Sequence, residues 1–161
     1  MFDRQIEESV EIAANPREVW HQLANFGAYP RWNPFITRVE GQLRAGARLT
    51  VTMKIASMPP AVFRPKVLVC EAERELRWRG RAGLAGLFSG EHAFIIETLG
   101  INRVRFRQRQ RFAGLLAPGA LALVAEGIRA GFREMNQRLR QRAEASHATR
   151  QVARTDRRTR E

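Results

Sequence analysis

The chain has 161 residues, of which 44% are apolar, enough for one domain with a hydrophobic core and too many for a disordered protein. Its formal net charge of +12 comes from arginine, because Lys54 and Lys66 are the only lysines among 28 basic residues. This charge favours weak contact with anionic surfaces at low salt. The single cysteine, Cys70, excludes an internal disulfide and a cysteine-based metal site.

Targeting signals are not evident in the sequence. The opening segment MFDRQIEES is charged and lacks the apolar stretch of a signal peptide. No uninterrupted apolar run reaches the roughly 18 residues that a membrane-spanning helix needs. We therefore expect a cytoplasmic protein.

A strand and a short helix are predicted first. The segment IEESVEIA (residues 6–13) alternates apolar and polar residues, as a half-buried strand does. The following NPRE carries the signals that start a helix: Asn15 as N-cap, Pro16 at the first helical position and Glu18 at the spacing of a capping box. We expect this helix to end near Gly27 and a compact turn, YPRWNP, to follow.

A series of strands comes next. Period-two alternation recurs in FITRVEG, ARLTVTMKI, RPKVLVCEA, LRWRGR, GEHAFIIETL and RVRFRQRQRF, which predicts about six antiparallel strands. Two apolar loops interrupt the series, SMPPAVF at residues 57–63 and AGLAGLF at residues 82–88. They would cap a cavity, contact a partner chain or fold onto the core, and the sequence leaves all three open.

The chain ends in a long helix and a polar segment. From about Ala120 to Ala145, apolar residues recur at three- and four-residue steps and form one stripe. The remaining residues are polar and charged, which predicts a frayed tail. We therefore divide the chain into a folded domain, residues 1–145, and a basic, disordered tail, residues 146–161. A curved antiparallel sheet around the long helix would bury both apolar faces.

Five arginines lie at alternate positions within the last predicted strand, from Arg103 to Arg111, and are here called the arginine comb. Period two puts them on the face opposite Val104 and Phe106, so they point to water if the apolar residues face the core. Cross-strand pairs with Glu91 and Glu97 would each contribute roughly 0.2–1 kcal/mol. The aromatic residues of this strand face the predicted core. A protein that binds nucleic acid exposes aromatic side chains so that bases can stack on them, so we expect no specific nucleic-acid partner.

Polar residues also stand on the inward parity of the strands. Gln108 and Gln110 occupy positions where valine or isoleucine is usual, and Glu8 and His92 share that parity. Burying such groups unpaired costs about 1–3 kcal/mol per missing hydrogen bond. Either these strand ends reach solvent, or the interior holds an apolar cavity with a few polar groups, as small-molecule pockets do.

Catalytic signals are few. Glu8 and His92 form the candidate acid–base pair. The sequence lacks a glycine-rich phosphate loop, a nucleophile elbow and residues at metal-ligand spacing, so it indicates no cofactor and no metal.

Several segments together resemble one superfamily. They are NPREVW, YPRWNPFI, GARL, FRPKVL, ELRWRG, GLFSGEHAF, FAGLL and GFREMNQRLRQRAEA. Over about residues 6–145 this combination resembles the START/polyketide cyclase superfamily (SRPBCC), in particular a bacterial polyketide cyclase/dehydrase-like branch. The resemblance implies an α+β helix-grip fold: a curved seven-stranded antiparallel sheet around the long C-terminal helix, two short helices after the first strand, and a ligand cavity between sheet and helix.

The leading hypothesis is that the domain binds or carries a hydrophobic small molecule, a lipid or a polyketide-like aromatic. The expected ligand-binding residues are Met53, Trp78, Phe94, Ile96, Phe106, Gln108, Gln110, Ala125, Ile128, Phe132 and Met135. An enzyme of cyclase or dehydratase type in the same cavity, with Glu8 and His92 as acid and base, is the alternative. Electrostatic binding of nucleic acid or a membrane surface through the comb and tail is the third hypothesis. The oligomeric state is left open, a homodimer included.

Overall fold

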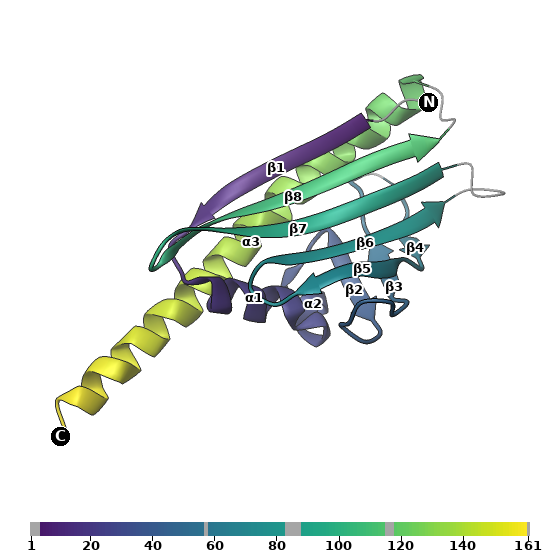
Figure 1. The fold of residues 1–161 in the computed structure, drawn as a ribbon. Coiled ribbons are helices and arrows are strands. Elements are labelled where there is room, and N and C mark those ends of the chain that lie inside the picture. The colour runs from purple at the N-terminus through teal and green to yellow at the C-terminus, as the bar shows by residue number, and fades with distance from the viewer. Residues whose placement is uncertain (1–3, 57, 83–87, 115–117, 161) are drawn as a thin grey trace.

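A computed structural model describes residues 4–56, 58–82, 88–114 and 118–160 (Figure 1). Most of the predicted loop AGLAGLF and residues 115–117, between the last predicted strand and the long helix, lie outside the described residues. The long C-terminal helix crosses one face of a curved sheet, and two short helices lie beside its middle (Figure 1). No helix among the described residues combines the length and the apolar character needed to cross a lipid bilayer.

The order of the elements follows the predicted one, with two exceptions. In chain order they are β1 (Arg4–Ile12), α1 (Pro16–Ala24), the 3₁₀ turn η1 (Phe26–Ala28), α2 (Tyr29–Trp32), β2 (Ile36–Glu40), β3 (Thr50–Met53), β4 (Ala61–Phe63), β5 (Lys66–Glu71), β6 (Glu75–Ala82), β7 (Phe88–Gly100), β8 (Arg103–Gly114) and α3 (Pro118–Arg158). The exceptions are α2, which lies in the segment expected to be a compact turn, and β4, which lies in the segment predicted as the loop SMPPAVF.

The strands form two antiparallel sets that continue into each other. One has the order β1-β8-β7-β6-β5 and the other the order β2-β3-β4. A bridge between Arg48 and Lys66 joins them, together with a hydrogen bond of 2.9 Å from Leu49 N to the Pro65 carbonyl. Pro65 has no N–H to donate, so the strand predicted as RPKVLVCEA starts two residues late, at Lys66, and is separated from β4. Counting β4 and β5 as one interrupted strand gives the seven-stranded sheet of the helix-grip fold.

The start of α1 confirms the N-cap prediction. The Asn15 side chain accepts a hydrogen bond of 2.9 Å from Glu18 N, and Pro16 is the first helical residue. The carboxylate of Glu18 is used differently from the capping box that the spacing predicted. It accepts a hydrogen bond of 2.9 Å from Ser146 Oγ and lies 2.9 Å from Arg150 Nε, both in α3.

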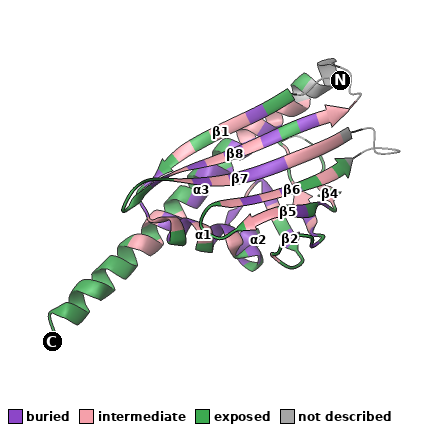
Figure 2. Cartoon of the chain, viewed as in Figure 1, coloured by how far each residue is buried: buried purple, intermediate pink, exposed green. Residues whose placement is uncertain are grey.

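This contact accounts for an error in the sequence-based prediction. The tail expected to be disordered beyond Ala145 is helical, because α3 continues to Arg158. No glycine or proline follows Gly131, so nothing in the sequence breaks the helix. Glu18 holds the first turns beyond the predicted end, and the last turns of α3 are exposed (Figure 2).

The core lies between the inner face of the sheet and α3. Trp78 and Phe106 are buried there, as strand parity predicted, and Phe132 of α3 packs edge-on against Phe35 with ring centroids 5.5 Å apart. Gly131 allows this approach, because a Cβ at that position would lie 2.1 Å from the Phe35 ring. The helix therefore lies closer to the start of β2 than an alanine would permit.

The arginine comb lies on the outer face, as predicted, and carboxylates compensate much of its charge. Arg107 lies 2.6 Å from Glu97, and its guanidinium hydrogen bond lowers the pKa of that carboxyl. Arg109 lies 3.0 Å from Glu7. Hydrogen bonds from Arg103 lower the pKa of Glu11 on β1 in the same way. The comb is thus a wall of ion pairs, with Glu7 and Glu11 as partners that the sequence analysis did not name.

Candidate functional site

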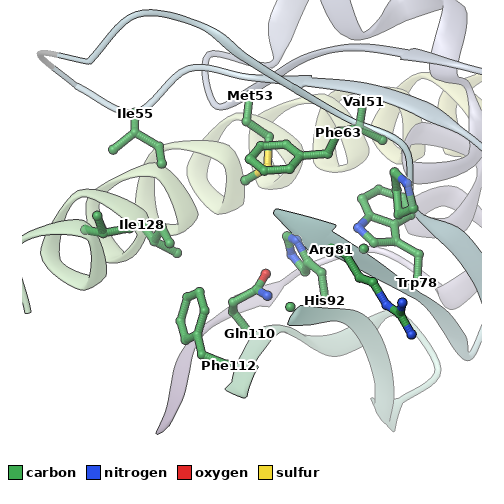
Figure 3. A pocket seen from close by; sticks show the side chains of 14 residues that line it. Val51, Met53, Ile55, Phe63, Trp78, Arg81, His92, Gln110, Phe112 and Ile128 are labelled. Atoms are coloured by element: carbon green, nitrogen blue, oxygen red, sulfur yellow. The ribbon is translucent and has the colours of Figure 1, made fainter. Parts of the chain in front are cut away.

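A cavity of about 110 Å³ lies between the N-terminal half of α3 and the strands opposite it (Figure 3). Its walls come from β3 and β4 on one side and from β6, β7 and β8 on the other. The lining residues are Val51, Met53, Ile55, Phe63, Pro65, Trp78, Gly80, Arg81, Gly90, His92, Gln110, Phe112, Val124 and Ile128. Most of them are apolar, which suits a ligand that leaves water for a hydrophobic surface.

Two glycines leave room for the cavity. Gly80 of β6 and Gly90 of β7 are directly paired across the two strands and both line the cavity. They share the inward parity of Trp78 and His92, so side chains at these positions would project into the same space. The amide of Gln110 covers Gly90: a Cβ on Gly90 would lie 2.6 Å from Gln110 Nε2. Gly80 therefore leaves open space in the wall, whereas Gly90 leaves the space that the Gln110 amide occupies.

His92 is the most deeply buried polar group in the cavity wall, with 2% of its surface exposed. Burial lowers its pKa to about 3, although the hydrogen bond to Gln108 acts in the opposite direction. The imidazole is therefore neutral at pH 7. Its ring stacks on Phe94 with centroids 4.2 Å apart and lies 5.0 Å from the ring of Phe132.

A buried hydrogen-bond chain fixes the tautomer of this histidine. Gln108 Nε2 donates to Asn136 Oδ1 over 2.7 Å, so Gln108 Oε1 is the group that faces His92 Nε2 at 3.1 Å. Because that oxygen can only accept, Nε2 carries the proton and Nδ1 is the acceptor of the ring. The neutral ring can therefore accept a hydrogen bond but has no second N–H to donate.

Two further polar side chains reach the cavity. Gln110 is mostly buried, and its Nε2 makes a long hydrogen bond of 3.4 Å to the carbonyl of Arg111. Arg81 is exposed and is the one charged residue among those that line the described part of the cavity. An amide, an imidazole and a guanidinium could thus orient a polar group on a mainly apolar ligand.

The structure divides the predicted ligand-binding residues into two groups. Met53, Trp78, Gln110 and Ile128 line the cavity. The others lie in or against the packed core instead, namely Phe94, Ile96, Phe106, Gln108, Ala125, Phe132 and Met135. The prediction that these residues face inward is correct. The aromatic rings among them pack in the core and are not among the residues that line the described cavity. Gln108 is satisfied by His92 and Asn136.

The proposed acid–base pair is not assembled around the cavity. Glu8 faces α3, as its parity predicted, and its carboxylate lies 3.3 Å from Arg133 and 3.9 Å from Arg129. His92 lines the cavity and has Gln108 as its hydrogen-bond partner. Glu8 is not among the residues that line the described cavity, so the two side chains have separate surroundings.

Sequence reasoning missed several lining residues. Phe112 shares the parity of Gln110, and the two glycines share that of Trp78 and His92, so an inward glycine was a usable signal. The wall formed by Val51, Ile55, Phe63, Pro65 and Val124 depends on how β3 and β4 fold over α3. In the predicted apolar loop SMPPAVF, the side chains of Met58 and Val62 are 45% and 61% exposed, so these two residues do not fold onto the core.

A curved antiparallel sheet closed over a long C-terminal helix, with a cavity between them, defines a protein of the START/SRPBCC superfamily. The family model described as polyketide cyclase / dehydrase and lipid transport matches residues 3–144, so the chain belongs to this family. No curated protein sequence gives a significant match.

Solved structures share the fold at low sequence identity. The Zhui aromatase/cyclase from Streptomyces sp. R1128 is 19% identical, with a TM-score of 0.64 over 94% of this chain and 96% of its own. A START superfamily protein from Mycobacterium smegmatis is 20% identical, with a TM-score of 0.63 over 90% and 97% of the two chains. The di-domain ARO/CYC BexL is 18% identical at a TM-score of 0.69 over 88% of this chain, which spans 46% of BexL.

Proposed function

We propose that this protein binds a small hydrophobic molecule in the cavity between the sheet and α3. The observation that carries the proposal is the space in a mainly apolar wall at Gly80, an inward strand position that carries no side chain. A fold that needed only a packed core would fill this position, since unfilled volume costs stability. The family described as including lipid transport supports the same conclusion.

The cavity volume limits what the ligand can be. At about 110 Å³ it resembles the roughly 150 Å³ engineered cavity that admits benzene, and it is smaller than typical pockets of about 300–1,000 Å³. One aromatic ring or a short alkyl chain fills it. A lipid or a polycyclic polyketide would place one end inside and the rest outside.

The polar groups restrict the chemistry of the buried end. The neutral imidazole of His92 accepts at Nδ1, and the amide of Gln110 can donate or accept. A hydroxyl on the ligand could donate to His92 and accept from Gln110. A carboxylate would face the acceptor nitrogen of His92, so a neutral hydroxylated ring fits this wall better than an acid.

Filling the cavity tests the proposal. Gly80→Ile adds a side chain that lines the cavity, and its Cβ meets only ordinary contacts, the nearest being Pro65 Cβ at 3.5 Å. Gly100→Ile makes the same change at the β7–β8 turn, where a Cβ meets nothing within 4 Å. Native mass spectrometry of the purified protein, followed by displacement of a fluorescent apolar probe, compares the three proteins.

We expect Gly80→Ile to lose the copurified ligand and to weaken probe binding by at least about tenfold, while Gly100→Ile behaves as the wild type. Equal binding by all three proteins would mean that the cavity is not the binding site. Circular dichroism and a thermal melt show whether each variant is folded, so a loss of binding through unfolding is recognised.

A cyclase or dehydratase activity in the same cavity is the second candidate. It is favoured by one observation, the acceptor nitrogen of His92 in an apolar wall, which could accept a hydrogen bond from a bound substrate and position it, although a pKa of about 3 makes the ring a weak base. Incubating the molecule identified by mass spectrometry with wild-type protein and with His92→Phe separates the two functions. A product that forms only with the wild type indicates an enzyme, and an unchanged ligand indicates a binding protein.

A further inference from the structure

A second pocket lies between α2 with its following residues and the C-terminal half of α3. Its volume is about 430 Å³, and it shares no residue with the cavity described above. The residues that line it are Pro30, Arg31, Trp32, Asn33, Pro34, Arg138, Gln141 and Arg142. Three of these are arginines and none is an acid, so the pocket has a strongly positive lining.

The arginines of this pocket differ from those of the comb. In the described part of the chain, Arg31 and Arg138 form no ion pair. Arg142 donates a hydrogen bond of 3.1 Å to Gln22 Oε1, and its guanidinium carbon lies 5.8 Å from the centroid of the Trp32 ring. Both of these neighbours are uncharged. The comb pairs its guanidiniums with glutamates, whereas here three guanidiniums surround a pocket without a negative charge.

Two buried donors in the pocket lining also lack acceptors. Asn33 is 4% exposed, and its Oδ1 accepts from the backbone N–H groups of Phe35 and Ile36 at 3.1 and 2.9 Å. These two bonds fix the orientation of the amide, so Nδ2 must be the remaining donor. Neither Asn33 Nδ2 nor the indole Nε1 of Trp32, which is 8% exposed, has a hydrogen-bond partner among the described residues.

We propose that this pocket binds the phosphate group of a phosphomonoester. Buried N–H groups are nearly always paired, so two orphan donors in residues that line one pocket favour an acceptor from outside, which a shift of the Trp32 and Asn33 side chains would admit to these two covered N–H groups. A phosphate dianion has three terminal oxygens and a charge that three guanidiniums neutralise, and guanidinium matches phosphate with paired hydrogen bonds. A carboxylate has one charge and two oxygens and leaves more of these donors unpaired. The ring of Trp32 with Pro30 and Pro34 forms an apolar wall for the organic part of the ligand.

The test follows the two orphan donors directly. ¹⁵N-labelled full-length protein is titrated at constant ionic strength with inorganic phosphate, glycerol phosphate and acetate. The indole Nε1–H of Trp32 and the side-chain amide of Asn33 are monitored by NMR. We expect both signals to shift saturably with the two phosphates and at least about tenfold more weakly with acetate.

Two double variants separate a built site from general attraction to a basic protein. Arg31→Gln/Arg138→Gln removes two charges from the pocket, and Arg154→Gln/Arg157→Gln removes two exposed charges from the end of α3. We expect phosphate affinity to fall at least about tenfold in the first and less than about twofold in the second. Equal weakening in both, or no saturable shift of Trp32 and Asn33 in the wild type, overturns the proposal.

Vesicles that contain phosphatidic acid identify the source of the phosphomonoester. Binding to these vesicles that glycerol phosphate displaces, and that the Arg31→Gln/Arg138→Gln variant loses, assigns the site to a lipid headgroup. Saturable binding of glycerol phosphate without vesicle binding assigns it to a free metabolite. If the Arg31→Gln/Arg138→Gln variant still binds the vesicles and the wild type does not bind glycerol phosphate, the proposal of a phosphomonoester site in this pocket is wrong.

Discussion

Mild acid should destabilise this protein because of His92. Burial lowers the pKa of this imidazole from its ordinary value of 6.5 to about 3 in the folded protein. In the unfolded chain the ring is hydrated and takes up a proton as the pH falls through about 6.5. The unfolded state therefore binds more protons than the folded state between these two values, and the contribution present above pH 6.5 is lost as the pH falls toward 3.

The size of the effect follows from the two pKa values. One pKa unit corresponds to about 1.36 kcal/mol, so the full difference approaches 5 kcal/mol at low pH. Between pH 7 and pH 5 the free energy of unfolding should fall by about 2 kcal/mol from this group. The glutamates whose pKa the comb lowers, Glu11 and Glu97, lose their contribution only below about pH 4.5, so the interval from pH 7 to 5 isolates His92.

Urea unfolding at a series of pH values measures this directly. We expect His92→Gln to remove most of the 2 kcal/mol fall, whatever its effect on stability at pH 7. The control is His21→Gln, which removes an exposed imidazole from α1 and should keep the pH dependence of the wild type. A His92→Gln protein that still loses about 2 kcal/mol between pH 7 and 5 would refute the assignment of the effect to this burial.

Three further predictions concern the fold. Gly131→Ala should lower the melting temperature, because the added Cβ would lie 2.1 Å from the Phe35 ring. Overpacking costs about 1–3 kcal/mol, more than the roughly 1 kcal/mol gained in helix propensity. An unchanged or raised melting temperature would show that α3 shifts freely. Arg105→Gln/Arg107→Gln should reduce the free energy of unfolding by less than about 1 kcal/mol per ion pair and leave any retention on a DNA column at physiological salt unchanged; a large loss of retention would restore the comb as a nucleic-acid surface. Glu18→Gln should speed amide hydrogen exchange in residues 146–158 and leave the N-terminal half of α3 protected, and exchange that stays as slow as in the wild type would show that this carboxylate does not hold the helix end.

The local chemistry of the sequence determined the strands, the start of α1 and the direction of the comb. An alternating row such as Arg105, Phe106 and Arg107 has only two faces available, so burial of the phenylalanine puts both arginines in water. Asn15 followed by Pro16 starts a helix through contacts within one turn. The quoted segments also led to the superfamily that the family comparison confirms.

Only the tertiary structure decided which part of the inner face is hollow and where α3 ends. The cavity depends on Gly80 and Gly90 meeting in register across two strands, and on β3 and β4 closing over α3, neither of which strand parity can show. The first turns of α3 beyond Ala145 are held by Glu18, which contacts Ser146, a residue 128 positions along the chain. The physical reason is the same in each case: periodicity reports which face a residue occupies, whereas packing volume and ion pairing depend on the partner that folding brings to that face.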